Sequence, residues 1–132
     1  MYEEKKIRVL IADDEPHILK LIGTVMSSMN NDVVARARNG NEAVEMFKEK
    51  KPDITLLDIN MPVKDGTAAL EEIMADTPDA FVIMMTSVSD METVEKCIEL
   101  GASHYIRKDT PIPEMKEMIL EAWNEYNKEK GG

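Results

Sequence analysis

The chain has 132 residues, 43% of them hydrophobic, so it can bury a sizeable core. Its formal net charge of −10 repels a phosphate backbone, so we expect no direct binding of nucleic acid. The longest apolar run, Ala80 to Met85, is far shorter than the roughly 20 residues that span a bilayer, and no basic-then-apolar signal segment opens the sequence. We therefore expect no membrane insertion and a cytoplasmic location. The lone cysteine, Cys97, excludes an internal disulfide and a multi-cysteine zinc site.

Short β-rich runs alternate with longer segments in which apolar residues recur three and four positions apart. We expect five strands, in chain order Ile7–Ala12, Asp32–Ala37, Asp53–Asp58, Ala80–Met85 and Ser103–Ile106. Two capping boxes, Asn39 with Glu42 and Ser89 with Glu92, predict helix starts, and Gly101 predicts a helix end.

This alternation predicts an α/β fold in which a parallel sheet has helices on both faces. The first, third and fourth runs are almost continuously apolar, as buried strands are, whereas the second and fifth are more polar and suit sheet edges. These features fit a flavodoxin-like, doubly wound (βα)5 three-layer sandwich with strand order 2-1-3-4-5. We expect one domain over residues 1–132, with a core of about residues 6–127 and a frayed end at Lys128–Gly132.

Polar residues follow the four strands that this topology places side by side, and ligands bind beyond the carboxyl ends of such strands. They are Asp13 and Asp14, Asp58 and Asn60, Thr86, and Lys108. Three carboxylates close together repel one another unless a cation lies among them, and oxygen ligands without histidine or cysteine suit Mg²⁺. A carboxylate can also attack phosphorus, and a lysine and a hydroxyl could then bind the phosphoryl oxygens.

Each of these residues also has a simpler explanation when it is taken alone. Asp14 could cap the first helix, Thr86 could satisfy loop amides, and Lys108 could be a solvated surface charge. We favour a functional site because the full set falls at neighbouring strand ends.

Five segments, in order, carry a resemblance to a known family. They are VLIADDEP at 9–16, NGNEAVEMF at 39–47, DITLLDINMPVKDG at 53–66, MTS at 85–87 and GASHYIRK at 101–108. With these motifs the chain resembles a response-regulator receiver domain of two-component signal transduction, of the stand-alone, chemotaxis-regulator type. The family usually has proline after the lysine, and here Asp109 follows Lys108 and puts a negative charge beside it.

The resemblance implies that Asp58 accepts a phosphoryl group from a histidine kinase and that Lys108 pairs with it. It implies Mg²⁺ as cofactor, held by Asp13, Asp14, Asp58 and the backbone carbonyl of Asn60. It also implies a conformational switch made by Thr86 and Tyr105, which signals to a downstream protein through the fourth helix, fifth strand and fifth helix. The resemblance implies that the chain catalyses only its own phosphorylation and slow dephosphorylation and is otherwise no enzyme.

Two alternatives remain open within this family. The domain could be a phosphorelay intermediate that passes the phosphoryl group to a histidine phosphotransfer protein. It could instead be a docking receiver that acts without phosphorylation, an alternative that Asp109 raises.

Two other classes of protein fit the sequence less well. An FMN protein would need a phosphate-binding loop after the first strand, where Asp13, Asp14 and Glu15 would repel the phosphate. An aspartyl-phosphate hydrolase of the haloacid dehalogenase type would have a second acid two residues after the nucleophile, where this chain has Asn60.

Overall fold

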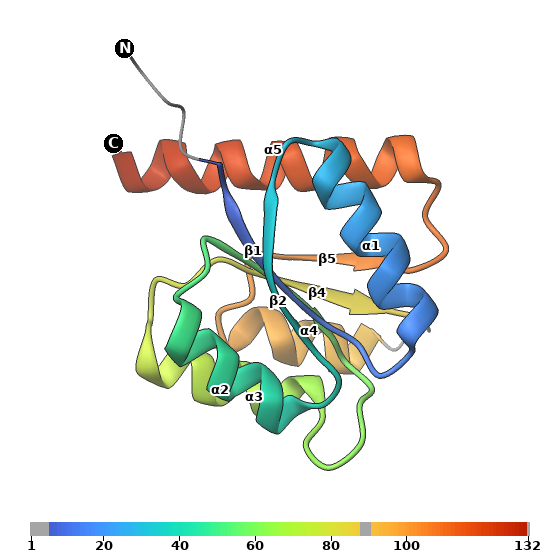
Figure 1. The fold of residues 1–132 in the computed structure, drawn as a ribbon. Helices are drawn as coiled ribbons and strands as arrows, with labels where there is room; N and C mark the ends of the chain where they lie inside the picture. The colour runs from blue at the N-terminus through green and yellow to red at the C-terminus, as the bar shows by residue number, and fades with distance from the viewer. Residues whose placement is uncertain (1–5, 88–90, 132) are drawn as a thin grey trace.

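A computed structural model describes residues 6–87 and 91–131, with side chains up to residue 129. Strands and helices alternate throughout these residues (Figure 1). The strands are β1 (Arg8–Ala12), β2 (Asp32–Ala37), β3 (Ile54–Asp58), β4 (Val82–Thr86) and β5 (His104–Arg107). The helices are α1 (Pro16–Ser28), α2 (Gly40–Lys50), α3 (Gly66–Asp76), α4 (Met91–Glu99) and α5 (Ile112–Gly131).

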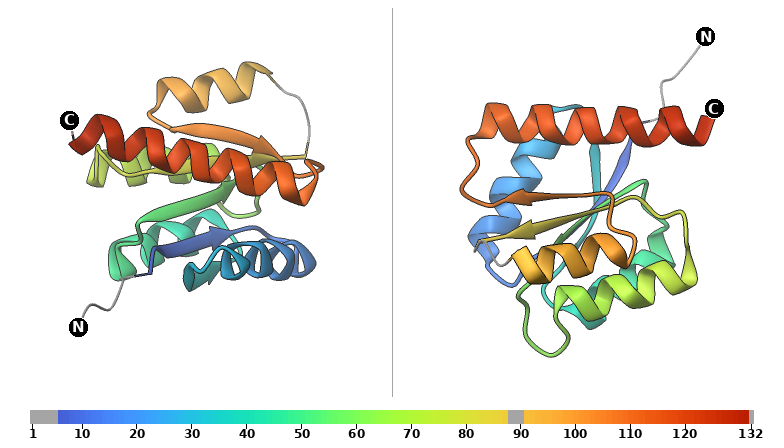
Figure 2. Two further views of the ribbon diagram at one scale, coloured as in Figure 1. Left: turned by 90° about the horizontal axis from the view of Figure 1, so that it is seen from above. Right: turned by 180° about the vertical axis from the view of Figure 1, so that it is seen from behind.

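The five strands form one parallel sheet in the order β2-β1-β3-β4-β5, so the predicted fold, strand order and edges are confirmed. Helices α1 and α5 cover one face, and α2, α3 and α4 cover the other (Figures 1 and 2). A separate hydrophobic cluster fills each of the two spaces between sheet and helices. Because all strands are parallel, their carboxyl ends meet at one edge of the sheet, where the candidate site residues lie.

The predicted strand ends agree with the structure to within one residue except at the start of β4. That strand begins at Val82 rather than Ala80, because the amide of Ala80 donates to the carbonyl of Thr77 (2.9 Å) and closes the turn after α3. Helix α5 continues to Gly131 and so includes most of the segment from Lys128 for which we expected a frayed end; the fraying itself stays a prediction. Lysine and glutamate, which alternate there, are good helix formers.

The helix signals read from the sequence were correct where the structure describes them. The side chain of Asn39 accepts a hydrogen bond from the amide of Glu42 (2.9 Å), and the Glu42 carboxylate accepts one from the amide of Arg38 (2.9 Å). Gly101 follows α4 with a φ of 113°, which glycine adopts readily. Ser89 lies outside the described residues, so the second capping box stays a prediction.

Aromatic side chains fix α5 at the amino end of β4. The ring of Phe81 lies 5.3 Å from that of Trp123 and 4.9 Å from that of Tyr126, measured between centroids. The Tyr126 hydroxyl donates to the backbone carbonyl of Asp79 (2.5 Å). Although α5 is the longest helix described, no helix in the described ranges is long and apolar enough to cross a membrane.

Two glycines offer a matched stability test. Gly23 lies inside α1, where an added Cβ would meet the flexible tip of Arg36, at 2.9 Å from Nη2. At Gly66 an added Cβ would fall against the backbone carbonyl of Asp58, which cannot move without disturbing β3. Since alanine is about 1 kcal/mol better than glycine in a helix interior, we expect Gly23→Ala to raise the free energy of unfolding by up to that amount.

We expect Gly66→Ala to lower the free energy of unfolding by about 2 kcal/mol or more, because the backbone at Asp58 must move. Urea denaturation followed by circular dichroism measures both. A destabilised Gly23→Ala variant, or an unaffected Gly66→Ala variant, would contradict this account of the two contacts.

Candidate functional site

A lysine lies between two buried aspartates at the carboxyl edge of the sheet. Lys108 Nζ is 2.6 Å from Asp13 Oδ2 and 3.1 Å from Asp58 Oδ2. The side chains are 9%, 3% and 2% exposed for Lys108, Asp13 and Asp58, respectively. Buried charges are costly unless they are paired, so the ammonium group is the counter-charge that lets two carboxylates occupy this edge. The alternative that Lys108 is a solvated surface charge was therefore wrong.

The backbone places these groups by extending the sheet just past the strand ends. The amide of Asp13 donates to the carbonyl of Ala37 at the end of β2 (3.0 Å). The amide of Lys108 donates to the carbonyl of Thr86 at the end of β4 (2.8 Å). Because β4 lies between β3 and β5, the lysine side chain must reach across the end of β4 to contact Asp58.

The second oxygen of each buried aspartate is held locally. Asp13 Oδ1 accepts from the amide of Glu15 (2.9 Å), and Asp58 Oδ1 accepts from the amide of Asn60 (3.3 Å). This leaves the Oδ2 atom of each residue for the lysine. The N-cap residue of α1 is Glu15, without a capping side chain, so Asp14 does not serve as the helix cap.

The pKa values at the site follow from burial and from the neighbouring charges. Burial, together with the negative charge of Asp13, raises the pKa of Asp58 to about 6, although Lys108 opposes the shift. Burial alone would lower the pKa of Lys108. The hydrogen bond to Asp13 and the charges of Asp58 and Asp13 outweigh that effect and raise it. The lysine is therefore charged at neutral pH.

The aspartates also form a candidate centre for a divalent cation. Asp13, Asp14 and Asp58 each offer a carboxylate oxygen, and these three atoms lie within 4.8 Å of one another. Three carboxylates against one ammonium group leave an excess of negative charge when all are ionised. An all-oxygen set of this kind suits Mg²⁺, so the residues present fit the predicted cofactor.

Thr86 and Tyr105 lie on the same face of the sheet. Tyr105 is opposite Met84 in the β4–β5 ladder, and Thr86 is two residues further along β4. Because side chains alternate between faces, both point toward the α4 side. Thr86 is buried and Tyr105 is half-buried. Their assignment as a switch pair stays a prediction.

Asp109 pairs with Arg107 rather than with Lys108. Arg107 Nε and Nη2 each lie 3.0 Å from one carboxylate oxygen of Asp109, a two-point contact. This hydrogen-bonded contact raises the pKa of Arg107 and lowers that of Asp109. No peptide bond in the described residues is cis, so the bond between Lys108 and Asp109 is trans. The unusual acidic residue thus leaves Lys108 in the site.

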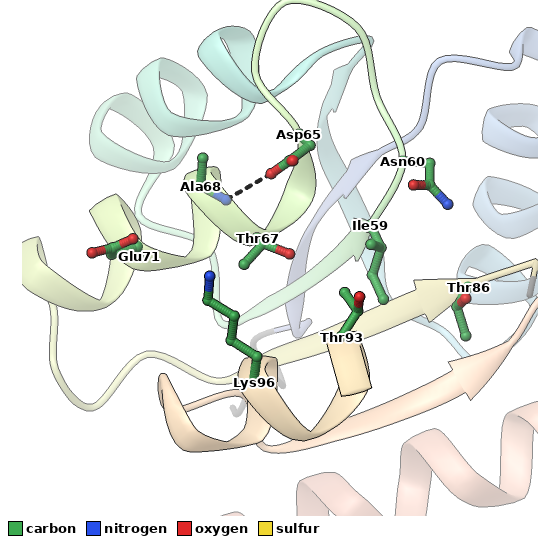
Figure 3. Close-up of a pocket in the computed structure, with 9 residues that line it drawn as sticks. All are labelled: Ile59, Asn60, Asp65, Thr67, Ala68, Glu71, Thr86, Thr93 and Lys96. Carbon is green, nitrogen blue, oxygen red and sulfur yellow. Dashed lines mark hydrogen bonds between the residues drawn. The ribbon is translucent and has the colours of Figure 1, made fainter. Parts of the chain in front are cut away.

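A cavity that was not predicted from the sequence lies beside the site, between α3 and α4 (Figure 3). Its volume is about 400 Å³, and Asn60 and Thr86 line the end nearest Asp58. Thr67 on α3 and Thr93 and Lys96 on α4 are among the other residues that line it. The sequence places Thr93 and Lys96 three residues apart, and therefore on one face of their helix. The gap itself could not be predicted, because it depends on how α3 and α4 pack.

Comparison with known proteins agrees with this geometry. The family model of the response regulator receiver domain matches residues 9–120. The chain belongs to this family. It is 40% identical over 116 residues to the chemotaxis protein CheY of Listeria monocytogenes, which covers 88% of this chain and 94% of the relative.

Two solved receiver-domain structures are closely similar in fold. A CheY-like receiver domain protein from Methanospirillum hungatei has a TM-score of 0.87 and 26% identity, covering 95% of this chain and 99% of the other. CheY in the CheX-CheY-BeF3-Mg²⁺ complex from Borrelia burgdorferi has a TM-score of 0.85 and 29% identity, covering 89% of each chain.

The raised pKa of Asp58 predicts how stability of this receiver domain changes with pH in the absence of divalent ions. An unfolded aspartate ionises near pH 4, so the contribution of Asp58 to the stability of the parent should fall between about pH 4 and about pH 6. Asp58→Asn removes this group. We therefore expect the unfolding free energy of the variant, relative to the parent, to rise over this window and then level off.

Urea denaturation in EDTA across this pH range measures the difference. The lost contact with Lys108 shifts the absolute stability of the variant, so the test is the slope. A difference that stays constant or falls as the pH rises would contradict the raised pKa.

The charges around Asp58 predict different effects on its pKa for substitutions at two adjacent residues. Lys108→Met removes a charge that lowers the pKa of Asp58, so that pKa should rise above about 6. Asp109→Asn alters a group that is held by Arg107, so it should leave the pKa of Asp58 unchanged. Carbon-13 NMR of the Asp58 carboxyl group, without divalent ions, measures the pKa of Asp58 in both variants. A shift in the Asp109 variant as large as that in the Lys108 variant would place Asp109 inside the site.

Proposed function

We propose that this receiver domain accepts a phosphoryl group on Asp58 from the phosphohistidine of a kinase, with Mg²⁺, and signals to a downstream protein. The observation that carries the proposal is the contact of Lys108 with both Asp58 and Asp13 at a buried carboxylate cluster. A purely structural ion pair needs one carboxylate for one lysine. Here a second buried carboxylate and Asp14 remain, and they supply the negative charge that a divalent cation requires.

In the proposed reaction a carboxylate oxygen of Asp58 attacks phosphorus as the nitrogen–phosphorus bond of the phosphohistidine breaks. The electron pair of that bond leaves with the imidazole, which takes a proton from solvent. Lys108 lies where its ammonium group can pair with a phosphoryl oxygen, and the Thr86 hydroxyl would donate to another. The pKa of Asp58, about 6, keeps most of the nucleophile ionised at neutral pH.

Mg²⁺ would be held by the carboxylates of Asp13, Asp14 and Asp58 and by the backbone carbonyl of Asn60. When bound, it would neutralise negative charge on the transferring phosphoryl group. The protein's own contribution is to hold these oxygens together, which the hydrogen bonds from the amides of Glu15 and Asn60 support.

Signalling would use Thr86 and Tyr105, which share the α4 side of the sheet. A new negative group at Asp58 would draw the Thr86 hydroxyl toward it, and Tyr105 would turn inward. The downstream protein would contact the surface of α4, β5 and α5, where Ile98 and Leu120 are 45% and 51% exposed. Binding of one state by the partner would then shift the population toward it.

Incubation with acetyl phosphate and Mg²⁺ tests the central step. We expect a mass increase of one phosphoryl group that requires Mg²⁺ and is absent from Asp58→Asn, read by intact-protein mass spectrometry. Asp13→Asn should reduce the yield because it removes both a metal ligand and a partner of Lys108. Asp109→Asn serves as the matched control for loss of one acidic charge and should be phosphorylated like the parent.

Failure of the folded parent to gain mass would overturn the proposal and favour a docking receiver that acts without phosphorylation. A gain that persists in Asp58→Asn would place the phosphoacceptor at another residue.

A further inference from the structure

A basic groove is formed by residues of α1 and by residues at the end of the edge strand β2. Helix α1 lies on the opposite side of the sheet from α4 (Figure 1). The volume of the groove is about 600 Å³. The residues that line it are Pro16, Leu19, Lys20, Gly23, Thr24 and Ser27 of α1 together with Arg36 and Arg38. Three of these residues are cationic and none is acidic. This composition is unusual in a chain with a net charge of −10.

The three cations have no acidic partner in the described part of the chain. No described carboxylate lies within 4 Å of the charged groups of Lys20, Arg36 or Arg38. The nearby Glu42 carboxylate accepts from the backbone amide of Arg38 instead. All three side chains are exposed. Their charge is therefore available to a ligand rather than used to stabilise the fold.

The guanidinium group of Arg36 lies close to Gly23 of α1. Gly23 is buried, and a Cβ there would come within 2.9 Å of Arg36 Nη2. The missing side chain thus lets the arginine lie close to the helix. Pro16 and Leu19 add apolar surface beside the cations. A ligand that fits has negative groups separated by apolar ones.

The charge distribution favours a short acidic segment over an extended polyanion. Fixed charges act over about 10 Å at 0.1 M ionic strength, so three clustered cations can attract a small ligand locally. A long nucleic acid would also meet the acidic remainder of the surface, beginning with Asp14 and Glu15 beyond the Pro16 end of the groove.

We propose that the groove between α1 and β2 binds an acidic segment of a partner protein, with its carboxylates at Arg36, Arg38 and Lys20. This binding does not depend on phosphorylation of Asp58. The site is also distinct from the α4–β5–α5 surface, because β2 and β5 are opposite edges of the sheet and α4 lies on the other face from α1 (Figure 2). The domain can therefore hold one protein at this groove while another contacts α4.

The test uses a short synthetic peptide of glutamate and leucine, with a twin in which glutamine replaces glutamate. Nitrogen-15 NMR of the unphosphorylated protein measures which amides shift on titration and gives the dissociation constant. We expect shifts in α1 and in residues 36–38 with the acidic peptide, and binding at least about tenfold weaker with the glutamine twin, because the attraction is electrostatic.

The variant Arg36→Glu/Arg38→Glu should weaken binding of the acidic peptide by about tenfold or more. Lys48→Glu/Lys50→Glu makes the same change in net charge on exposed residues of α2 and should bind like the parent. The spectra themselves show whether each variant is folded. If Arg36→Glu/Arg38→Glu is misfolded, Arg36→Gln/Arg38→Gln replaces it in the test.

Four results would overturn the proposal. The acidic peptide could shift only residues outside the groove, or the two double variants could lose affinity equally. A short single-stranded oligonucleotide could bind the groove more tightly than the peptide, which would assign it to nucleic acid. Sedimentation that shows a dimer disrupted by Arg36→Glu/Arg38→Glu would assign the groove to a second copy of the chain.

Discussion

The ammonium group of Lys108, between two buried carboxylates, is the contact on which the carboxyl edge of this sheet depends. Asp13 follows β1 and Asp58 ends β3, so their charges repel each other across adjacent strands. The lysine comes from the far side of β4 and neutralises part of this repulsion. Removing one partner of a buried ion pair typically costs about 3–5 kcal/mol, because the other charge stays buried. The functional edge and the stability of the sheet are therefore linked through one side chain.

That contact also bears on the response to phosphorylation that we propose. Two carboxylates compete for one cation, and the pKa of Asp58 is raised to about 6 as a result of burial and of its neighbour Asp13. In the function that we propose, a phosphoryl group on Asp58 would give Lys108 a more strongly charged partner. The change would begin at a group that already bridges β1, β3 and β5, so it could reach Thr86 and the α4 side of the sheet without large backbone movement.

Much of this architecture could be predicted from the sequence, because hydrophobic periodicity specifies strands and helices and their alternation specifies a parallel sheet. The convergence of Asp13, Asp58 and Lys108 followed from the strand order alone. The start of β4 could not be predicted, because it depends on the turn that Ala80 closes. Nor could the sequence show that Asp109 turns toward Arg107, since adjacent charges leave the side-chain directions open. The cavity beside Thr86 and the groove beside α1 depend on spacing between elements, which no local pattern encodes.

The aromatic cluster at the amino end of β4 has a practical consequence for spectroscopy. The chain's one tryptophan, Trp123, packs against Phe81 and Tyr126 at the sheet edge opposite to Asp58. Its emission depends on the contact between α5 and the sheet and not on charges near the acidic cluster. Intrinsic fluorescence will therefore follow global unfolding of this domain, and it will report local events at Asp58 only when they move α5 against the sheet. A probe for those events has to be introduced near the site, on the α4 side of the sheet.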